Sequence, residues 1–277
     1  MVKISCIDST DLVETARKIH RLNPTPTAAF GRTLTMAAMM GAALKNENEK
    51  ITVQVMGDGP LGTMVVCANC KGEVKGYVNN PLAEAPLNEK GKLNVKAIVG
   101  EGTLNIIKDI GLKEPYVGNV PLVSGEIAED FAYYFANSEQ IPTAVALGVL
   151  VDKDGSVKRA GGYVIQALPD TPEQILKLME ERLASAKSIT EMLEENMPLE
   201  EIAQYISDDL NTYSIEEFVP KYVCDCSKER FEKAIFSMNK KDIMELANDE
   251  ETEVCCNFCD KKYKFSKDEI MKLVDLK

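Results

Sequence analysis

The chain has 277 residues and a mass of 30.6 kDa, enough for one large hydrophobic core and smaller modules. A hydrophobic share of 45% and a charged share of 27% are typical of a globular protein and exclude disorder throughout. The formal net charge of -12 argues against a nucleic-acid partner, because phosphate binding needs clustered Lys and Arg. We therefore expect a protein or small-molecule partner.

The apolar stretches of the chain indicate the cellular compartment in which it folds. Asp8 follows the first residues too soon to leave room for the apolar region of a signal peptide. The most apolar stretch, Leu34 to Leu44, is too short to span a bilayer. We therefore expect a cytosolic protein that does not contact membranes, in which eight cysteines indicate metal ligands or redox thiols before a disulfide framework.

Residues 1–170 carry the patterns of one α+β domain. Residues 51–56 alternate, the turn-rich segment Gly57 to Gly62 follows, and residues 63–66 are again extended, which predicts a hairpin. Further strands are expected at 74–78, 103–107, 144–151 and 157–168. Helices are expected at 27–44 and 126–136. The prediction is an α+β core with a mixed or antiparallel sheet.

Residues 171–220 have a different composition. Thr171-Pro172-Glu173-Gln174 has an N-cap residue, Pro at the first helical position and Gln at the third, which predicts a helix. Two more helices are expected at 188–195 and 198–206. From Glu173 to Glu217, twelve carboxylates stand against three basic residues, and repulsion among them opposes compaction. We predict an acidic helical linker that is either a solvated connector or an element that unfolds.

Residues 221–277 form a small third module. Helices are expected at 227–238 and 241–247, followed by a hairpin over 253–265. Ser266-Lys-Asp-Glu269 is a capping box that opens a last helix. With fewer than sixty residues the module is short of core, so a bound metal would add stability.

Four cysteines of this module, Cys224, Cys226, Cys256 and Cys259, have the pattern of a metal site. A tetrahedral zinc ion accepts four thiolates at about 2.3 Å, and one such ion is favoured over four free thiols. A closed tetrathiolate has no position for substrate, which excludes a hydrolytic zinc centre. The chemistry alone favours a fixed structural zinc, because most closed tetrathiolate sites are structural. It leaves open a redox-sensitive one, because thiolates are the form that oxidants attack.

The residues around these cysteines run from Cys224 to Phe231 and from Val254 to Cys259, followed by Lys262-Tyr263 and Phe265-Ser266. They closely resemble the C-terminal redox domain of the 33 kDa heat-shock chaperonin family. Six segments upstream resemble that family's substrate-binding domain: Pro26–Ala29, Gly31–Thr35, Gly57–Gly62, Lys71–Val78, Val123–Glu126 and Ala160–Val164. The resemblance keeps its order and covers nearly the whole chain.

The resemblance implies an ATP-independent holdase, not an enzyme, that is inactive while reduced and zinc-bound. Oxidative stress with partial unfolding would form the disulfides Cys224–Cys226 and Cys256–Cys259, expel zinc and unfold the acidic linker. The apolar surface exposed in this way would capture unfolding client proteins, typically as a homodimer. The sequence has no Gly-x-x-x-x-Gly-Lys-Ser/Thr nucleotide loop, which agrees with a chaperone that uses no nucleotide.

The other cysteines allow competing interpretations. Cys255 adjoins Cys256 and offers an alternative register for the metal site, although only Cys256 gives Cys-x-x-Cys with Cys259. Cys67 and Cys70 form a second Cys-x-x-Cys, interpreted as sequestered small residues with a dithiol oxidoreductase as the alternative. A zinc-ribbon adaptor with a fixed metal is the remaining alternative function. Cys6 is interpreted as core filler.

Three further patterns are interpreted as structural. His20, the one histidine, is attributed to a basic surface near the first helix. The glycines of Gly57 to Gly62 match a dinucleotide motif only superficially, because a strand rather than a helix is expected after them. Met36, Met39 and Met40 are interpreted as helix core, with client contact as the alternative.

Overall fold

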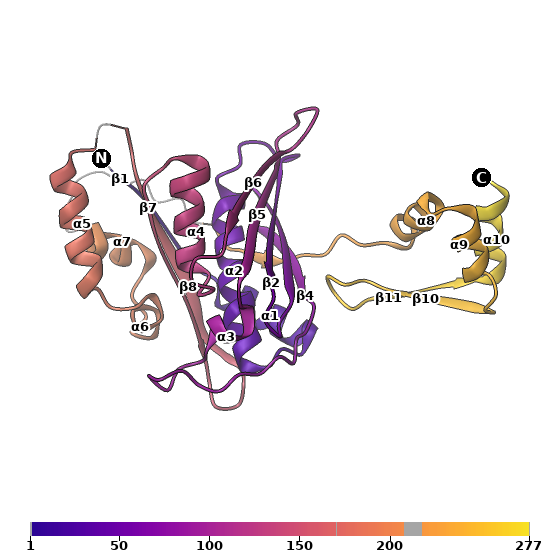
Figure 1. Ribbon diagram of the computed structural model, residues 1–277, viewed down its shortest axis with the longest axis horizontal. Helices are drawn as coiled ribbons and strands as arrows, with labels where there is room; N and C mark the ends of the chain where they lie inside the picture. Colours follow the sequence, from indigo (N-terminus) through magenta and orange to yellow (C-terminus); the bar gives the residue numbers. More distant parts are fainter. Residues whose placement is uncertain (1, 170, 208–217, 277) are drawn as a thin grey trace. The chain divides into compact units, whose positions relative to one another are not determined.

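The computed structural model describes residues 2–169, 171–207 and 218–276, which divide into the units Met1–Tyr222 and Val223–Lys277 (Figure 1). In the described residues the first unit has two sheets and the second has one hairpin, and each unit has its own buried core. The α+β class expected from the sequence is confirmed. The finer division into a core, a linker and a metal-binding module stays a prediction.

The larger sheet of the first unit has six described strands. In sheet order they are β6 (Tyr116–Pro121), β5 (Gly102–Asp109), β2 (Lys50–Gly57), β3 (Thr63–Asn69), β4 (Glu73–Val78) and β9 (Lys221–Tyr222). All neighbours are antiparallel except β4 and β9, so the sheet is mixed. The predicted hairpin is β2–β3, where Val53 lies opposite Val66. The sequence analysis did not predict β6 or β9.

The smaller sheet has three antiparallel strands, in the order β1 (Val2–Asp8), β8 (Val157–Ala167) and β7 (Thr143–Val151). Its β7–β8 hairpin was predicted, whereas β1 was not. Val2, Ile4 and Cys6 point to one core and Ile7 to another, so both faces of β1 are covered.

Helix α2 (Pro24–Ala42) packs against β2, β3 and β4 of the larger sheet and against β7 and β8 of the smaller one. This position explains why it is apolar on nearly all sides. Gly31 allows the close packing, because a Cβ there would lie 2.7 Å from Val13 and 2.9 Å from Val149. The remaining helices of this core are α1 (Thr10–His20), α3 (Val95–Val99), α4 (Ala128–Tyr134) and the π-helix η1 (Phe135–Glu139).

Residues 171–207, the part of the acidic segment before the undescribed residues 208–217, fold into α5 (Glu173–Ser185), α6 (Ile189–Glu194) and α7 (Leu199–Ser207), as predicted. They lie on the face of the β1–β8–β7 sheet that is opposite to α2 (Figure 1). Met192 and Ile202 are fully buried there with Ile4 of β1. Charge repulsion is therefore opposed by a second apolar core. Among the described helices, none is long and apolar enough to cross a membrane.

The second unit pairs one hairpin with three helices. Its elements are β10 (Glu251–Cys255), β11 (Lys262–Ser266), α8 (Lys228–Ser237), α9 (Lys240–Leu246) and α10 (Lys267–Asp275). The predicted capping box is present, with Ser266 and Glu269 each accepting a backbone N–H of the other. The buried core is limited to Ile235, Ile243, Ala247, Phe265, Ile270 and Val274. So small a core predicts a need for further stabilisation.

Candidate metal centre

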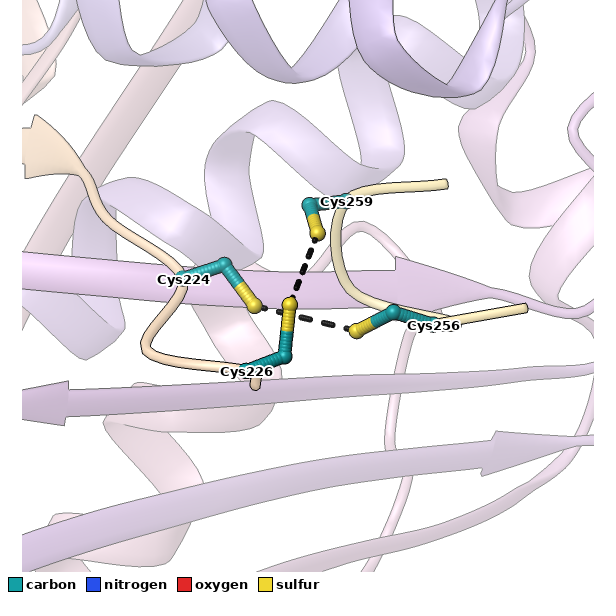
Figure 2. Close-up of side chains that lie close together, drawn as sticks. All are labelled: Cys224, Cys226, Cys256 and Cys259. Atoms are coloured by element: carbon teal, nitrogen blue, oxygen red, sulfur yellow. Dashed lines mark hydrogen bonds between the residues drawn. The ribbon is translucent and has the colours of Figure 1, made fainter. Parts of the chain in front are cut away.

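Two chain corners of the second unit supply the four predicted cysteines. Cys224 and Cys226 lie in the extended stretch before α8, where Ser227 caps the helix by accepting the Arg230 N–H. Cys256 and Cys259 lie in the turn between β10 and β11. The Cys259 and Asp260 N–H groups both donate to the Cys256 carbonyl, at 3.2 and 2.8 Å. From this tight turn the sulfurs of Cys256 and Cys259 point toward those of Cys224 and Cys226 (Figure 2).

The structure brings the four sulfurs together (Figure 2). Cys224 Sγ lies 3.7 Å from Cys256 Sγ, and Cys226 Sγ lies 3.3 Å from Cys259 Sγ. All four atoms are within 4.8 Å of one another. Bonds of about 2.3 Å at tetrahedral angles require sulfurs about 3.8 Å apart. The donor set and spacing therefore fit one tetrahedral metal ion.

Cys255 lies outside this cluster. Its strand position opposite Lys262 leaves it exposed, whereas Cys256, one residue further, is buried. The alternation of a strand thus separates the two neighbouring thiols, and the alternative register has no support in the geometry. Among the described residues, the four sulfurs are the one group of three or more potential ligands close enough to share a metal.

The thiols of the cluster differ in acidity. Burial raises the pKa of Cys224 and of Cys259. Burial also acts on Cys226, but hydrogen bonds from Tyr263 and the neighbouring cysteines outweigh it and lower its pKa to about 7. A thiol of this acidity is about half ionised near neutral pH, so Cys226 is the member of the cluster that ionises most readily.

Tyr263 is the residue of this site that the sequence analysis did not assign. Its hydroxyl lies 3.2 Å from Cys226 Sγ and donates to the Cys226 carbonyl at 3.0 Å. Its ring packs on Phe231 of α8, with centroids 5.1 Å apart. Tyr263 is among the residues that resemble the chaperonin family. Its contact with Cys226 joins residues 37 positions apart, so no local sequence pattern predicts it.

The remaining cysteines lie in the first unit. Cys6 is buried in the core under α5–α7, as expected of core filler, and burial raises its pKa to about 12. Cys67 and Cys70 are half-buried at the end of β3, and Cys67 Sγ lies 3.5 Å from Thr52 Oγ1. They belong to no metal cluster among the described residues.

The other candidates of the sequence are structural as well. Met36, Met39 and Met40 are buried, as predicted, and line a cavity of about 150 Å³. Gly57 precedes a turn and then β3, so no helix opens there. A Cβ on Gly57 would lie 1.9 Å from the Val99 carbonyl oxygen, which explains the glycine.

His20 differs from its expected place on a basic surface. It is half-buried, and its Nε2 lies 3.0 Å from the Tyr222 hydroxyl. Its ring also packs edge-on against Phe30, at 5.9 Å between centroids. The sequence could not place Tyr222 beside it, because the two residues are 202 positions apart.

Known proteins match both the sequence and the geometry. The family model described as Hsp33 protein matches residues 1–266. The chain belongs to the Hsp33 family. Among its Hsp33 relatives, a 33 kDa chaperonin of Clostridium perfringens is 50% identical over 280 residues, covering 100% of this chain and 88% of the relative. One from Clostridium botulinum strain 657 is 48% identical over 271 residues, covering 97% and 92%.

A solved Hsp33 structure agrees as well. The crystal structure of the 33 kDa chaperonin (heat shock protein 33 homolog) from Thermotoga maritima has a TM-score of 0.90 and 38% sequence identity to this chain. The match covers 99% of this chain and 94% of the other. Membership of the Hsp33 family makes the chain a chaperone, and the geometry adds a four-cysteine cluster that could hold a metal ion.

Proposed function

We propose that this protein is a redox-regulated, ATP-independent holdase and not an enzyme. The observation that carries the proposal is the set of four sulfurs within 4.8 Å, in a unit with a small apolar core. We assign Cys224, Cys226, Cys256 and Cys259 as ligands of one zinc ion in the reduced, inactive form. Bound zinc would hold the sulfurs as thiolates and add folding free energy to this unit.

Oxidation by a peroxide removes these thiolates in two steps. One thiolate attacks a peroxide oxygen, the O–O bond breaks, hydroxide leaves, and a sulfenic acid forms. A neighbouring thiolate then attacks that sulfur, the S–O bond breaks, and a second hydroxide leaves as the disulfide forms. Each disulfide passes two electrons from sulfur to the peroxide. The family resemblance favours the pairs Cys224–Cys226 and Cys256–Cys259, although the sulfur contacts of 3.7 and 3.3 Å in the folded cluster join Cys224 to Cys256 and Cys226 to Cys259.

The acidic linker, residues 171–220, is the element that we expect to unfold. The segment 173–217 carries much of the net negative charge of the chain, and its helices α5–α7 depend on one apolar face. Their release would uncover Ile4, Tyr163 and Ile165 of the smaller sheet, which are all buried beneath them. Such a surface suits capture of unfolding polypeptides, because exposed apolar side chains of a client gain burial there.

The same proposal includes the binding partners, the oligomeric state and the cellular location of the protein. Clients are unfolded or partly folded proteins, and the oxidised form acts as a homodimer in the cytosol. The surplus of acidic residues opposes binding of nucleic acid. The predicted parts are a substrate-binding and dimerisation core over 1–170, the linker over 171–220 and the redox module over 221–277.

An aggregation assay tests this proposal. A thermally unfolding client is mixed with the reduced, zinc-loaded protein or with protein treated with peroxide at mild heat, and light scattering is followed without ATP. We expect suppression only after oxidation. Equal suppression by both forms, or by neither, contradicts the proposal.

Two variants separate the alternatives. In Cys259→Ser the metal site loses one ligand, so regulation should be lost. In Cys67→Ser regulation should persist. Loss of regulation or activity in Cys67→Ser alone would favour the dithiol interpretation. Retention of zinc through oxidation, with one stable partner, would favour the adaptor.

A further inference from the structure

We propose that Tyr263 is a positioning residue that protects the Cys226 thiolate and slows oxidative release of the metal. The inference rests on the proposed function, because it requires a metal-bound thiolate and an oxidant. It assigns to one hydroxyl the control of how readily the cluster opens.

The geometry gives Cys226 a contact that its neighbours lack. A thiolate has no proton to donate, so at 3.2 Å the Tyr263 hydroxyl is the donor and Cys226 Sγ the acceptor. The same hydroxyl donates to the Cys226 carbonyl at 3.0 Å, so its single proton is shared between two acceptors of one residue. Cys224 and Cys259 instead have backbone N–H groups beside their sulfurs, those of Cys226 and Lys261.

The hydroxyl is held in place by packing. Tyr263 lies on β11 between Lys262 and Lys264, whose side chains pair with Glu253 and Glu251 across the hairpin. Its half-buried ring packs on Phe231 at 5.1 Å. The ring thereby connects the hairpin that carries one cysteine pair to the helix that follows the other pair. The hydroxyl consequently has little freedom to leave Cys226 while this unit is folded.

A hydrogen bond lowers the energy of the sulfur lone pair that attacks a peroxide. Charge-assisted hydrogen bonds are about twice as strong as neutral ones, so the loss of even a shared one has a measurable effect on rate. Removal of the hydroxyl should make Cys226 more nucleophilic. It should also leave the tetrathiolate with one donor fewer to balance its negative charge. Both effects favour faster opening.

The test compares Tyr263→Phe with the wild type in the full-length, reduced protein loaded with zinc. Peroxide is added, and released zinc is followed with a chromophoric chelator. We expect release about three- to tenfold faster in the variant. A second readout uses protein loaded with Co2+, in which we expect the sulfur-to-cobalt charge-transfer band to move to lower energy.

Two control variants separate a failure of the Tyr263 inference from a failure of the proposed function. Tyr116→Phe removes a hydroxyl of the first unit and should leave the release rate and the cobalt band unchanged. Phe231→Leu keeps the Tyr263 hydroxyl but loosens its packing, so it should move the band in the same direction as Tyr263→Phe and by less. An unchanged release rate and band in Tyr263→Phe overturn this inference and leave the proposed function standing. Equal acceleration by Phe231→Leu with no band shift in either variant also overturns it. A wild type that keeps its zinc in peroxide defeats the proposed function as well.

Discussion

The substitution Met192→Ala tests whether the docked helices α5–α7 hold the chaperone inactive. Met192 is fully buried in the apolar core between α6 and the smaller sheet. Replacing a buried Met by Ala costs about 2–4 kcal/mol, because apolar contacts are lost and a cavity remains. At 1.4 kcal/mol for each factor of ten, the undocked population should rise about 30- to 1,000-fold.

Hydrogen exchange measures this shift directly. In the reduced, zinc-loaded variant, we expect amides of α5–α7 to exchange faster, while β10 and β11 remain as in the wild type. Aggregation of a client should then be suppressed without oxidant. Met244→Ala is the matched control, since Met244 is 51% exposed on α9 and its truncation should change little.

One outcome would refute the reasoning. If the α5–α7 amides exchange faster and zinc stays bound, but the variant suppresses aggregation no better than Met244→Ala, the surface under these helices does not capture clients. Unchanged exchange in Met192→Ala would show that the helices are not separately releasable.

Three other substitutions test local features. Asp260 follows Cys259 in the turn and has a φ of 57°, a left-handed conformation that glycine adopts without strain. Asp260→Gly should therefore stabilise the turn by about 1 kcal/mol and slow zinc loss to a chelator severalfold. Faster zinc loss would contradict this. The buried Asp130 carboxylate accepts hydrogen bonds from four backbone N–H groups of residues 123–127. Asp130→Asn should therefore lower the free energy of unfolding by about 2–3 kcal/mol in urea titrations. An unchanged free energy of unfolding would show that these N–H groups find other acceptors. The Arg17 guanidinium lowers the pKa of Glu14 from 4.5 to about 2, so this ion pair stabilises the fold above pH 4.5 and its contribution is lost as pH falls toward 2. Urea titrations at pH 6 and pH 3 should therefore find Glu14→Gln less stable than wild type mainly at pH 6, and an equal deficit at both would contradict the cause.

Local patterns were enough for the elements with strong periodicity. The alternation around Val53 and the turn glycines predicted the β2–β3 hairpin, and the capping box at Ser266 predicted α10. β1 was missed although Val2, Ile4 and Cys6 alternate, because the sequence does not show that both faces of this edge strand pack against apolar cores. β9 has two residues and pairs with β4 from far along the chain, which no local pattern encodes.

The sequence predicted which four cysteines come together, but not the side chains that contact them. Spacing selected the pairs, and the resemblance placed Cys256 rather than Cys255 in the cluster, where the structure also brings it. The hydroxyl of Tyr263 beside Cys226 depends on hairpin register and on packing against Phe231. The apolar core beneath the acidic helices likewise required the fold, because the sequence predicted the helices and their charge but not the sheet face on which they pack.

The central claim is that opening of the four-cysteine cluster activates the chaperone. Zinc release and client light scattering can be recorded together in one sample after peroxide is added at mild heat. The account predicts that about one zinc ion per chain is released, and that suppression of scattering rises as zinc release proceeds and reverses on reduction with added zinc. Suppression that develops while zinc stays bound, or complete zinc release without suppression, would contradict it.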